Sequence, residues 1–247
     1  MFAGTHEARR LCLLLAEEPR LAPVASLAGV TDGCRRYPVP VRLGPFGGPD
    51  PLGAYLSSQN IAAVVDATHP FASRIRHTVA AGASCASVPL LRLTRKQWMP
   101  TALDNWTHVA DMAAAAEAVP QGSSVFLATG TGGIEPFLER SDLRLHLRVI
   151  DSSRAPTNSG DLRVHLWRPP YSIAHETALF RRLRITHLVV KNSGGALGFS
   201  KLAAARNTGV TVVMIERPAE PPCNTPKLFE PKEAMNWLRA HLCLNQR

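Results

Sequence analysis

Short apolar, β-branched runs alternate with helical patterns along almost the whole chain. Apolar runs bounded by turn residues predict strands, and apolar residues spaced three or four apart predict helices. The expected strands cover residues 24–27, 39–43, 61–66, 88–93, 124–129, 143–150, 162–167, 187–191 and 210–215. The expected helices cover residues 6–18, 52–59, 68–82, 109–119, 172–184, 200–207 and 231–242. This alternation favours an α/β fold with parallel sheets.

The chain has 247 residues, which is enough for two domains of similar size. The tract 96–105 interrupts the alternation, so we expect doubly wound domains at 1–100 and 101–247, the second ending in the terminal helix. Three residues precede Gly4, where such a domain opens with a buried strand of about five residues. Neighbouring strands would then keep unpaired backbone groups. We therefore expect that the first strand is truncated and that Met1 is not the natural start.

Charge adds one expectation about the ligand. Lys and Arg number 28 against 19 Asp and Glu, and the formal net charge of +9 is spread evenly over both halves. Nucleic-acid binding usually needs a basic run or a recognisable module, and the sequence contains neither, so no nucleic-acid partner is expected. A diffuse positive field suits a small polyanionic ligand, although it also serves solubility alone.

Several classes of site and location are not indicated by the sequence. No apolar run is long enough for a membrane span and no signal-peptide pattern opens the chain, so we expect a cytoplasmic protein without membrane association. The five cysteines are scattered without a C-x-x-C pair, and no histidine or carboxylate motif indicates a metal site. The sequence also lacks a G-x-S-x-G elbow, so hydrolase chemistry has no nucleophile.

Ligands of open α/β sheets bind outside the carboxyl ends of the strands, where loops meet helix N-termini. Five loops fit that position and carry Gly, Thr, Ser or Asn, which can offer N–H groups and hydroxyls to an anion. They cover residues 4–7, 44–49, 67–72, 129–133 and 192–195. The first loop opens a helix with small residues but lacks the G-x-G-x-x-G pattern of dinucleotide sites.

The segment D-A-T-H-P-F-A at 66–72 has two interpretations. Thr68 can cap a helix whose first turn contains Pro70, with Asp66 near the positive helix end. Helix capping does not explain why a histidine stands at position 69, whereas in a ligand-binding loop His69 would contact the ligand. Both interpretations remain open at this point.

Lys191 and four arginines form a second group of candidates. Lys191 directly follows an apolar strand and precedes N-S-G-G, so it either contacts a ligand or is a solvated lysine at a turn. The arginines that stand at or just past strand ends are Arg42, Arg92, Arg95 and Arg168. If these cations face one cleft they would line a carboxylate site, but their spacing leaves this open.

In this order, the segments resemble the precorrin-6A reductase family, which includes cobalt-precorrin-6A reductases. The most specific strings are D-A-T-H-P-F-A at 66–72 and K-N-S-G-G at 191–195, and V-R-L-G-P-F-G-G at 41–48 and P-L-L-R-L at 89–93 accompany them. The resemblance extends almost from end to end. It implies two Rossmann-like domains with parallel sheets and an active site in the cleft between them.

The resemblance implies reduction of a macrocycle double bond of precorrin-6A, or of its cobalt form, to precorrin-6B in cobalamin (vitamin B12) biosynthesis. The hydride would come from NADPH. NADH stays open because Val30 stands where the family usually has an arginine, for which Arg35 or Arg36 could substitute. The tetrapyrrole substrate carries many acetate and propionate groups, and neighbouring enzymes of the corrin pathway are further candidate partners. The alternative function is that of a non-catalytic tetrapyrrole carrier of the same fold.

The resemblance also assigns site residues by position. Those expected at the cofactor are Gly4, Thr5, Glu7, Asp66, Ala67, Thr68, His69, Pro70 and Phe71. Those expected at the substrate are Arg42, Arg92, Arg168, Lys191, Asn192, Ser193, Gly194, Gly195 and Lys201. A proton must also reach the macrocycle, from a side chain or from water, and the candidate side chains are His69, Lys191 and Tyr171. No metal is expected.

Overall fold

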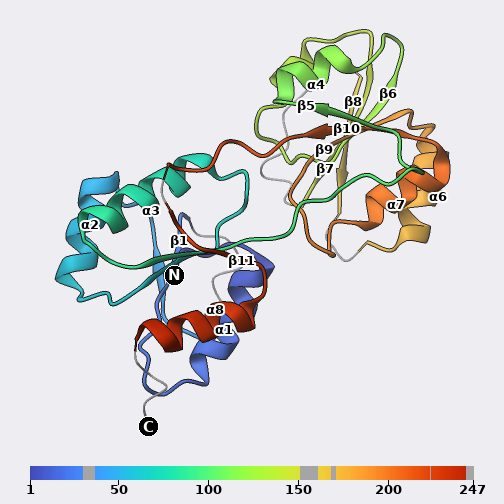
Figure 1. Ribbon diagram of the computed structural model, residues 1–247. Helices are drawn as coiled ribbons and strands as arrows, with labels where there is room; N and C mark the ends of the chain where they lie inside the picture. Colours follow the sequence, from blue (N-terminus) through green and yellow to red (C-terminus); the bar gives the residue numbers. More distant parts are fainter. Residues whose placement is uncertain (30–36, 151–160, 168–170, 223, 243–247) are drawn as a thin grey trace. The chain divides into compact units, whose positions relative to one another are not determined.

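A computed structural model of the protein describes residues 1–29, 37–150, 161–167, 171–222 and 224–242. The chain folds into two compact units, one formed by Met1–Lys96 with Ala219–Arg247 and the other by Gln97–Pro218 (Figure 1). Each unit has its own parallel sheet and its own core. The C-terminal segment therefore belongs to the first unit. This corrects the expectation of a second domain that runs from 101 to 247 and includes the terminal helix.

Parallel strands build the sheet of the first unit. They are β1 (Ala25–Leu27), β2 (Val41–Leu43), β3 (Val64–Asp66), β4 (Leu90–Leu93) and β11 (Lys227–Leu228). β1 pairs with β2, and β4 lies between β3 and β11. Phe2 bridges Ser26 of β1 and Asp66 of β3. The order β2-β1-Phe2-β3-β4-β11 is that of a doubly wound Rossmann sheet, with Phe2 in the place of the first strand.

The first strand is short, but its neighbours are fully paired along it. Four backbone hydrogen bonds of 2.8–3.0 Å join it to β1 and β3: Phe2 N–H to Val65 O, Ala67 N–H to Phe2 O, Ala3 N–H to Ser26 O and Ser26 N–H to Met1 O. The expectation that a three-residue strand would leave unpaired groups beside it is therefore wrong. The extended segment Met1–Ala3 supplies the partners that β1 and β3 need.

Helices cover both faces of this sheet. On one face α1 (His6–Ala16) packs against α8 (Pro231–His241), and on the other α2 (Pro49–Ser58) packs against α3 (Ser73–Cys85). Successive strand residues point to opposite faces. Val65 accordingly belongs to the core that contains residues of α1 and α8, while Val64 belongs to the core that contains residues of α2 and α3. The packing of α8 on α1 and the pairing of β11 with β4 hold the C-terminal segment on this unit.

A six-stranded parallel sheet in the order β5-β10-β9-β6-β7-β8 forms the second unit. Its strands are β5 (Trp106–Val109), β6 (Ser124–Leu127), β7 (Arg144–Val149), β8 (Leu162–Leu166), β9 (His187–Lys191) and β10 (Thr211–Ile215). Its helices are α4 (Met112–Ala118), α5 (Glu135–Leu138), α6 (Ile173–Leu183) and α7 (Ser200–Thr208). This is again the doubly wound order, with β6 as the first strand and β5 in the sixth position. None of the helices that the structure describes has the length and apolar character of a membrane span.

The sequence pattern does not predict β5 and β11, and both lie at sheet edges. Thr107 and His108 of β5 are exposed, and β11 has two residues, so neither shows an apolar run. Each also follows, in sequence, a strand of the other unit. β5 follows β4 of the first unit but pairs with β10, and β11 follows β10 but pairs with β4.

Asn192 holds the chain at the points where it enters and leaves the second unit. Its side chain is 1% exposed, accepts a hydrogen bond from Trp98 N–H at 2.9 Å and donates one to Trp98 O at 3.2 Å. Arg217 donates from Nε to Asn192 O at 2.8 Å and from Nη2 to Ser193 O at 3.1 Å. One buried turn thus fixes residues near both boundaries of the unit.

Replacing Phe2 with Ala should lower the free energy of unfolding by about 3 kcal/mol, because the loss of a buried aromatic ring leaves a cavity. The ring is 6% exposed and its centroid lies 5.6 Å from that of Phe46. Denaturant unfolding measures the change. Leu13→Ala is the control, since Leu13 on α1 is 56% exposed and its loss should cost less than about 0.5 kcal/mol. Equal losses in the two variants would contradict the central place of Phe2 in the sheet.

Asn192→Ala should destabilise the protein by about 2–3 kcal/mol, because it leaves the buried N–H and C=O groups of Trp98 without their side-chain partner. Asn105→Ala is a matched control, since the amide of Asn105 is exposed and bonds only to Thr211 Oγ1 among the contacts described for it, at 2.9 Å. Its loss should cost less than about 1 kcal/mol. Thermal unfolding of both variants tests this, and similar melting temperatures would show that Asn192 does not secure the chain.

Candidate functional site

The first unit has its topological switch point between the Phe2 segment and β3, and ligands of doubly wound sheets bind at such a point. Thr5 joins the two loops that meet there. It caps α1 by accepting a hydrogen bond from Ala8 N–H at 3.2 Å, and its hydroxyl donates to Ala67 O at 2.8 Å. Gly4 has a φ of 129°, a conformation that favours glycine. The predicted cofactor residues Gly4, Thr5 and Ala67 are thus brought together.

Asp66 shapes the loop that follows β3. Its Oδ1 accepts hydrogen bonds from Thr68 N–H at 3.0 Å and from the Thr68 hydroxyl at 2.7 Å. Thr68 is therefore not the cap of the next helix, because α3 begins only at Ser73 and Ala72 stands at its N-cap. The Asp66–Thr68 turn corrects the interpretation of this segment as a simple helix start.

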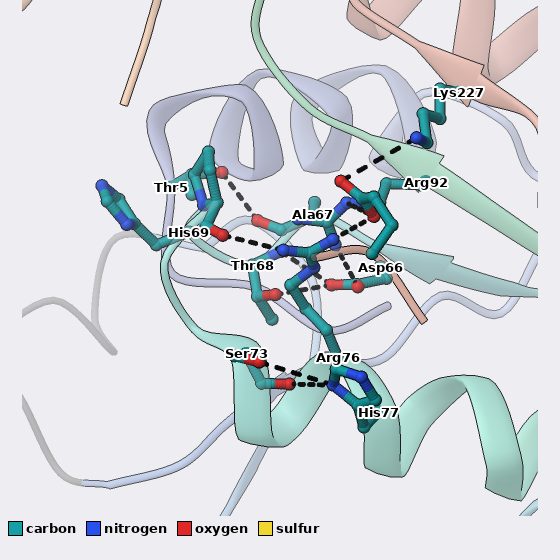
Figure 2. Close-up of polar contacts among 12 residues, drawn as sticks. Thr5, Asp66, Ala67, Thr68, His69, Ser73, Arg76, His77, Arg92 and Lys227 are labelled. Atoms are coloured by element: carbon teal, nitrogen blue, oxygen red, sulfur yellow. Dashed lines mark hydrogen bonds and ion pairs between the residues drawn. The ribbon is translucent and has the colours of Figure 1, made fainter. Parts of the chain in front are cut away.

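His69 is the titratable group of this loop that points away from the neighbouring ion pairs (Figure 2). Its Nδ1 accepts a hydrogen bond from Phe71 N–H at 3.2 Å. In a neutral imidazole the proton is then on Nε2, which becomes a hydrogen-bond donor. Pro70 is buried, and its carbonyl accepts from Arg76 Nη1 at 2.8 Å. The side chain of His69 thus points out of the loop, while the contacts of Pro70 and Phe71 hold the loop backbone in place.

Three other predicted site residues of the first unit form ion pairs within the protein. Glu7 accepts from Arg95 Nε at 2.7 Å. Arg92 is 4% exposed and pairs with the second oxygen of Asp66. Asp66 itself is 4% exposed, and its carboxylate is engaged by Thr68 and Arg92. The described arginines at strand ends therefore have partners within the unit instead of forming an open cationic lining.

Arg42 stabilises the glycine-rich loop that follows β2. It donates to Gly44 O at 2.7 Å and to Pro45 O at 3.2 Å. Its guanidinium also lies 3.5 Å from the centroid of the Phe46 ring, a cation–π contact. These contacts give Arg42 a structural role, and no contact of this kind places it at a substrate carboxylate.

The second unit has its switch point between β6 and β9. Lys191 ends β9, and its Nζ donates to Thr129 O at 3.2 Å and to Gly132 O at 3.4 Å in the loop after β6. Burial lowers the pKa of this lysine. Lys191 thus joins the two loops of this switch point, as Thr5 does in the first unit.

The rest of the K-N-S-G-G segment forms the turn that supports Lys191. The hydroxyl of Ser193 donates to Lys191 O at 3.0 Å, and Gly194 and Gly195 have φ values of 72° and 80°. Lys201 donates to Gly198 O at 2.7 Å. Asn192 is buried in the contacts with Trp98 given above, so a ligand would meet the turn and not the Asn192 side chain.

Tyr171 lies at a different edge of the second sheet. It follows β8, which is separated from β9 by β6 and β7, or roughly 14 Å at the usual strand spacing. Its hydroxyl donates to Trp167 O at 2.7 Å, and burial raises its pKa. Arg168 lies outside the described residues. Lys191 and Tyr171 are therefore not brought together at the switch point.

Two buried ion-pair systems were not predicted from the sequence. Arg148 pairs with Glu176 through bonds of 2.7 and 2.5 Å, and Arg76 pairs with Glu220. Partners so distant in sequence leave no local signal. The burial of Arg76 on the inner face of α3 is a weak indication that its charge is used. In the described part of the chain, no three His, Cys, Asp or Glu side chains gather as a metal site would need.

Comparison with known proteins agrees with this architecture. Residues 1–239 match the family described as precorrin-6x reductase CbiJ/CobK. The precorrin-6A reductase of Rhodobacter capsulatus is 38% identical over 98% of this chain and 95% of its own length. That of Rhodococcus erythropolis is 40% identical over 96% of both chains. A solved structure named CobK precorrin-6A reductase superposes with a TM-score of 0.88 at 38% identity, covering 97% of this chain and 95% of that one. The chain therefore belongs to the precorrin-6x reductase family.

Proposed function

We propose that the chain uses NADPH to reduce a macrocycle double bond of precorrin-6A, giving precorrin-6B in cobalamin biosynthesis. The observation that carries the proposal is the pair of Rossmann switch points, each closed by a side chain that links its two loops. Family membership over residues 1–239 supports the reaction type. A carrier without hydride transfer would not need a nucleotide-binding turn at Thr5.

The first unit is the proposed cofactor unit. The N–H groups at the start of α1 suit the pyrophosphate, because helix N-termini attract anions. The neutral side chain of Thr5 holds this turn against Ala67, so the phosphates meet backbone donors and not a carboxylate. NADPH is the preferred form because Arg35 and Arg36 follow β1 in sequence, where a Rossmann domain binds the adenosine ribose. Both arginines lie outside the described residues.

The second unit is the proposed substrate unit. Its switch point carries a cation, Lys191, whose Nζ is held by two carbonyls at 3.2 and 3.4 Å. An ammonium group at this position attracts an approaching carboxylate. The glycine turn behind Lys191 leaves backbone N–H groups near the same loop.

Bound reduced nicotinamide supplies the hydride, and the protein positions the reactants and supplies a proton. His69 and Lys191 lie at switch points, whereas Tyr171 lies roughly three strands away from Lys191 and its hydroxyl bonds to a backbone carbonyl. We therefore favour His69 or Lys191 as the donor. A lowered pKa makes the Lys191 ammonium a stronger acid than free lysine.

An anaerobic assay tests the function directly. Mixing the protein with precorrin-6A and NADPH should oxidise the cofactor in step with loss of the tetrapyrrole, and the product should gain two hydrogen atoms in mass. Parallel reactions with NADH and with cobalt-precorrin-6A establish the preferred cofactor and substrate. Tetrapyrrole binding without cofactor oxidation would replace the proposal with the carrier function.

Two variants test whether the first unit binds the cofactor and the second unit binds the substrate. Thr5→Val should weaken cofactor binding about tenfold and leave the KM for precorrin-6A unchanged, because the link between the cofactor loops is lost. Lys191→Met should raise the KM for precorrin-6A about tenfold and leave the cofactor Kd unchanged. Cofactor fluorescence titration and steady-state kinetics give the two constants.

Control variants come from similar residues on exposed helix faces. Thr78→Val removes an exposed hydroxyl on α3 and Lys232→Met an exposed cation on α8, and neither should alter Kd or KM. The proposed roles would be reversed if Thr5→Val changed the KM alone and Lys191→Met changed the cofactor Kd alone.

A further inference from the structure

Two buried arginines converge at the carboxyl ends of β3 and β4, beside the turn at Asp66 (Figure 2). Arg76 comes from α3 and is 1% exposed, and Arg92 comes from β4 and is 4% exposed. Arg76 donates to Pro70 O at 2.8 Å, and Arg92 pairs with Asp66. One carboxylate oxygen of Glu220, Oε2, contacts Nη2 of Arg76 and lies 3.7 Å from Nε of Arg92.

These two guanidinium groups keep donors that the described residues do not satisfy. Nη2 of Arg76 contacts Glu220 in an ion pair, whereas Nε of Arg76 and both Nε and Nη2 of Arg92 are buried without a hydrogen-bond partner among the described residues. A buried donor without a partner is costly, and more so when it is charged. Asp66 engages Nη1 of Arg92 with one oxygen, while its other oxygen accepts two bonds from Thr68. The two guanidinium groups can therefore donate further hydrogen bonds to an oxyanion that replaces Glu220.

The charges of the surrounding groups and the cavity beside the two arginines also favour the binding of an anion. Two buried cations face one buried carboxylate, and burial lowers the pKa of Arg92, with Arg76 adding to the effect while Asp66 opposes it. A small cavity of about 40 Å³ is lined by both arginines, by Asp66 and by Glu220. It is too small for a carboxylate group beside that of Glu220, so a ligand could enter only in its place.

Glu220 is placed so that it can leave. Its side chain is 34% exposed, in contrast to the arginines it contacts. It belongs to an irregular segment between β10 and β11, next to Pro221, so its withdrawal breaks no helix or strand. Outside, Lys227 Nζ lies 3.9 Å from Glu220 Oε1 and could hold the displaced carboxylate at the surface.

We propose that Arg76 and Arg92 form an oxyanion-binding site in which Glu220 holds the place of a ligand's carboxylate or phosphate. The identity of that ligand rests on the proposed function, which offers the carboxylates of the tetrapyrrole and the phosphates of the cofactor. In a Rossmann sheet the cofactor phosphates lie at the turn after the first strand. The site of Arg76 and Arg92 instead follows β3 and β4, which take the fourth and fifth strand positions of that fold. That position favours a substrate carboxylate.

Chemical rescue with acetate tests the site without any turnover. Glu220→Ala removes the Cγ methylene and the carboxylate, and acetate restores the same atoms. Glu220→Ala should melt at a lower temperature than the unaltered protein, and millimolar acetate should raise its melting temperature by several degrees with saturation. In the unaltered protein the half-saturating concentration should be at least tenfold higher, because Glu220 competes. If Glu220→Ala folds poorly, its refolding yield against acetate concentration gives the same measurement.

Three controls separate a built oxyanion site from other causes. Acetamide has the shape of acetate without its charge and should not rescue Glu220→Ala. Glu216→Ala removes a glutamate that pairs with His108 on the exposed surface, and acetate should not affect this variant. The double variant Arg76→Met with Glu220→Ala should lose the response to acetate. Rescue by acetamide as well as acetate, or no rescue by acetate, would overturn the proposal.

Ligand binding by Glu220→Ala then identifies the source of the oxyanion. If the site takes a substrate carboxylate, the KM for precorrin-6A should fall at least threefold while the NADPH Kd stays constant. If it takes a cofactor phosphate, the NADPH Kd should fall instead, and inorganic phosphate should compete with NADPH. If neither constant changes, Glu220 is a structural ion-pair partner only and the proposal fails. Acetate rescue without any turnover of precorrin-6A would contradict the proposed function but not the oxyanion site.

Discussion

The pairing of Met1–Ala3 between β1 and β3 is the constraint on which the first site depends. In the described part of the chain, β1 and β3 are linked through this segment and not to each other. The four backbone bonds of the segment set its register, and the register brings Thr5 within 2.8 Å of Ala67 O. A shift of one residue would turn the Phe2 side chain out of its core and separate the two loops.

In each unit a side chain links the two loops at the switch point, but the two side chains differ in charge. In each, parallel strands on either side of the switch point send their loops in opposite directions, so a side chain must close the gap between them. A neutral hydroxyl closes it in the first unit and an ammonium group in the second. A hydroxyl leaves an anion to the backbone N–H groups, as a pyrophosphate requires, whereas a partly desolvated ammonium adds a full charge that suits carboxylates. This difference is the physical basis for the proposal that the first unit binds the cofactor and that the second unit binds the substrate.

The sequence predicted the elements with strong periodicity and failed where tertiary contacts decide. Helix 6–18 and strand 187–191 appear as α1 and β9 because their apolar spacing is regular. The helix expected from Thr68 starts instead at Ser73, because residues 66–68 form a turn in which Thr68 donates to the carboxylate of Asp66. β5 and β11 lacked an apolar pattern, since an edge strand is defined by the neighbour it pairs with.

The same distinction holds for the candidate site. Loops at strand ends could be predicted because parallel strands share one edge, and Thr5, Ala67 and Lys191 do lie at switch points. The partners of the charged residues could not be predicted. Glu220 reaches Arg76 only because the C-terminal segment returns to the first unit, a crossing that no local pattern records.

Buried guanidinium groups occur near the carboxyl ends of strands in both units, but their surroundings differ. Arg148 forms a bidentate pair with Glu176 at 2.7 and 2.5 Å, and its unpartnered atom is Nε alone. Apart from the Arg76 Nη2 that pairs with Glu220, Arg76 and Arg92 together leave three nitrogen atoms without hydrogen-bond partners among the described residues. A buried ion pair contributes little stability even when its geometry is good, and an incompletely bonded one is costly. Unsatisfied guanidinium donors in an apolar core would only destabilise the fold. At the strand ends where ligands bind, the same donors can bind an anion. We therefore interpret the bidentate pair of the second unit as structural, and the incompletely bonded arginines of the first unit as the proposed anion site.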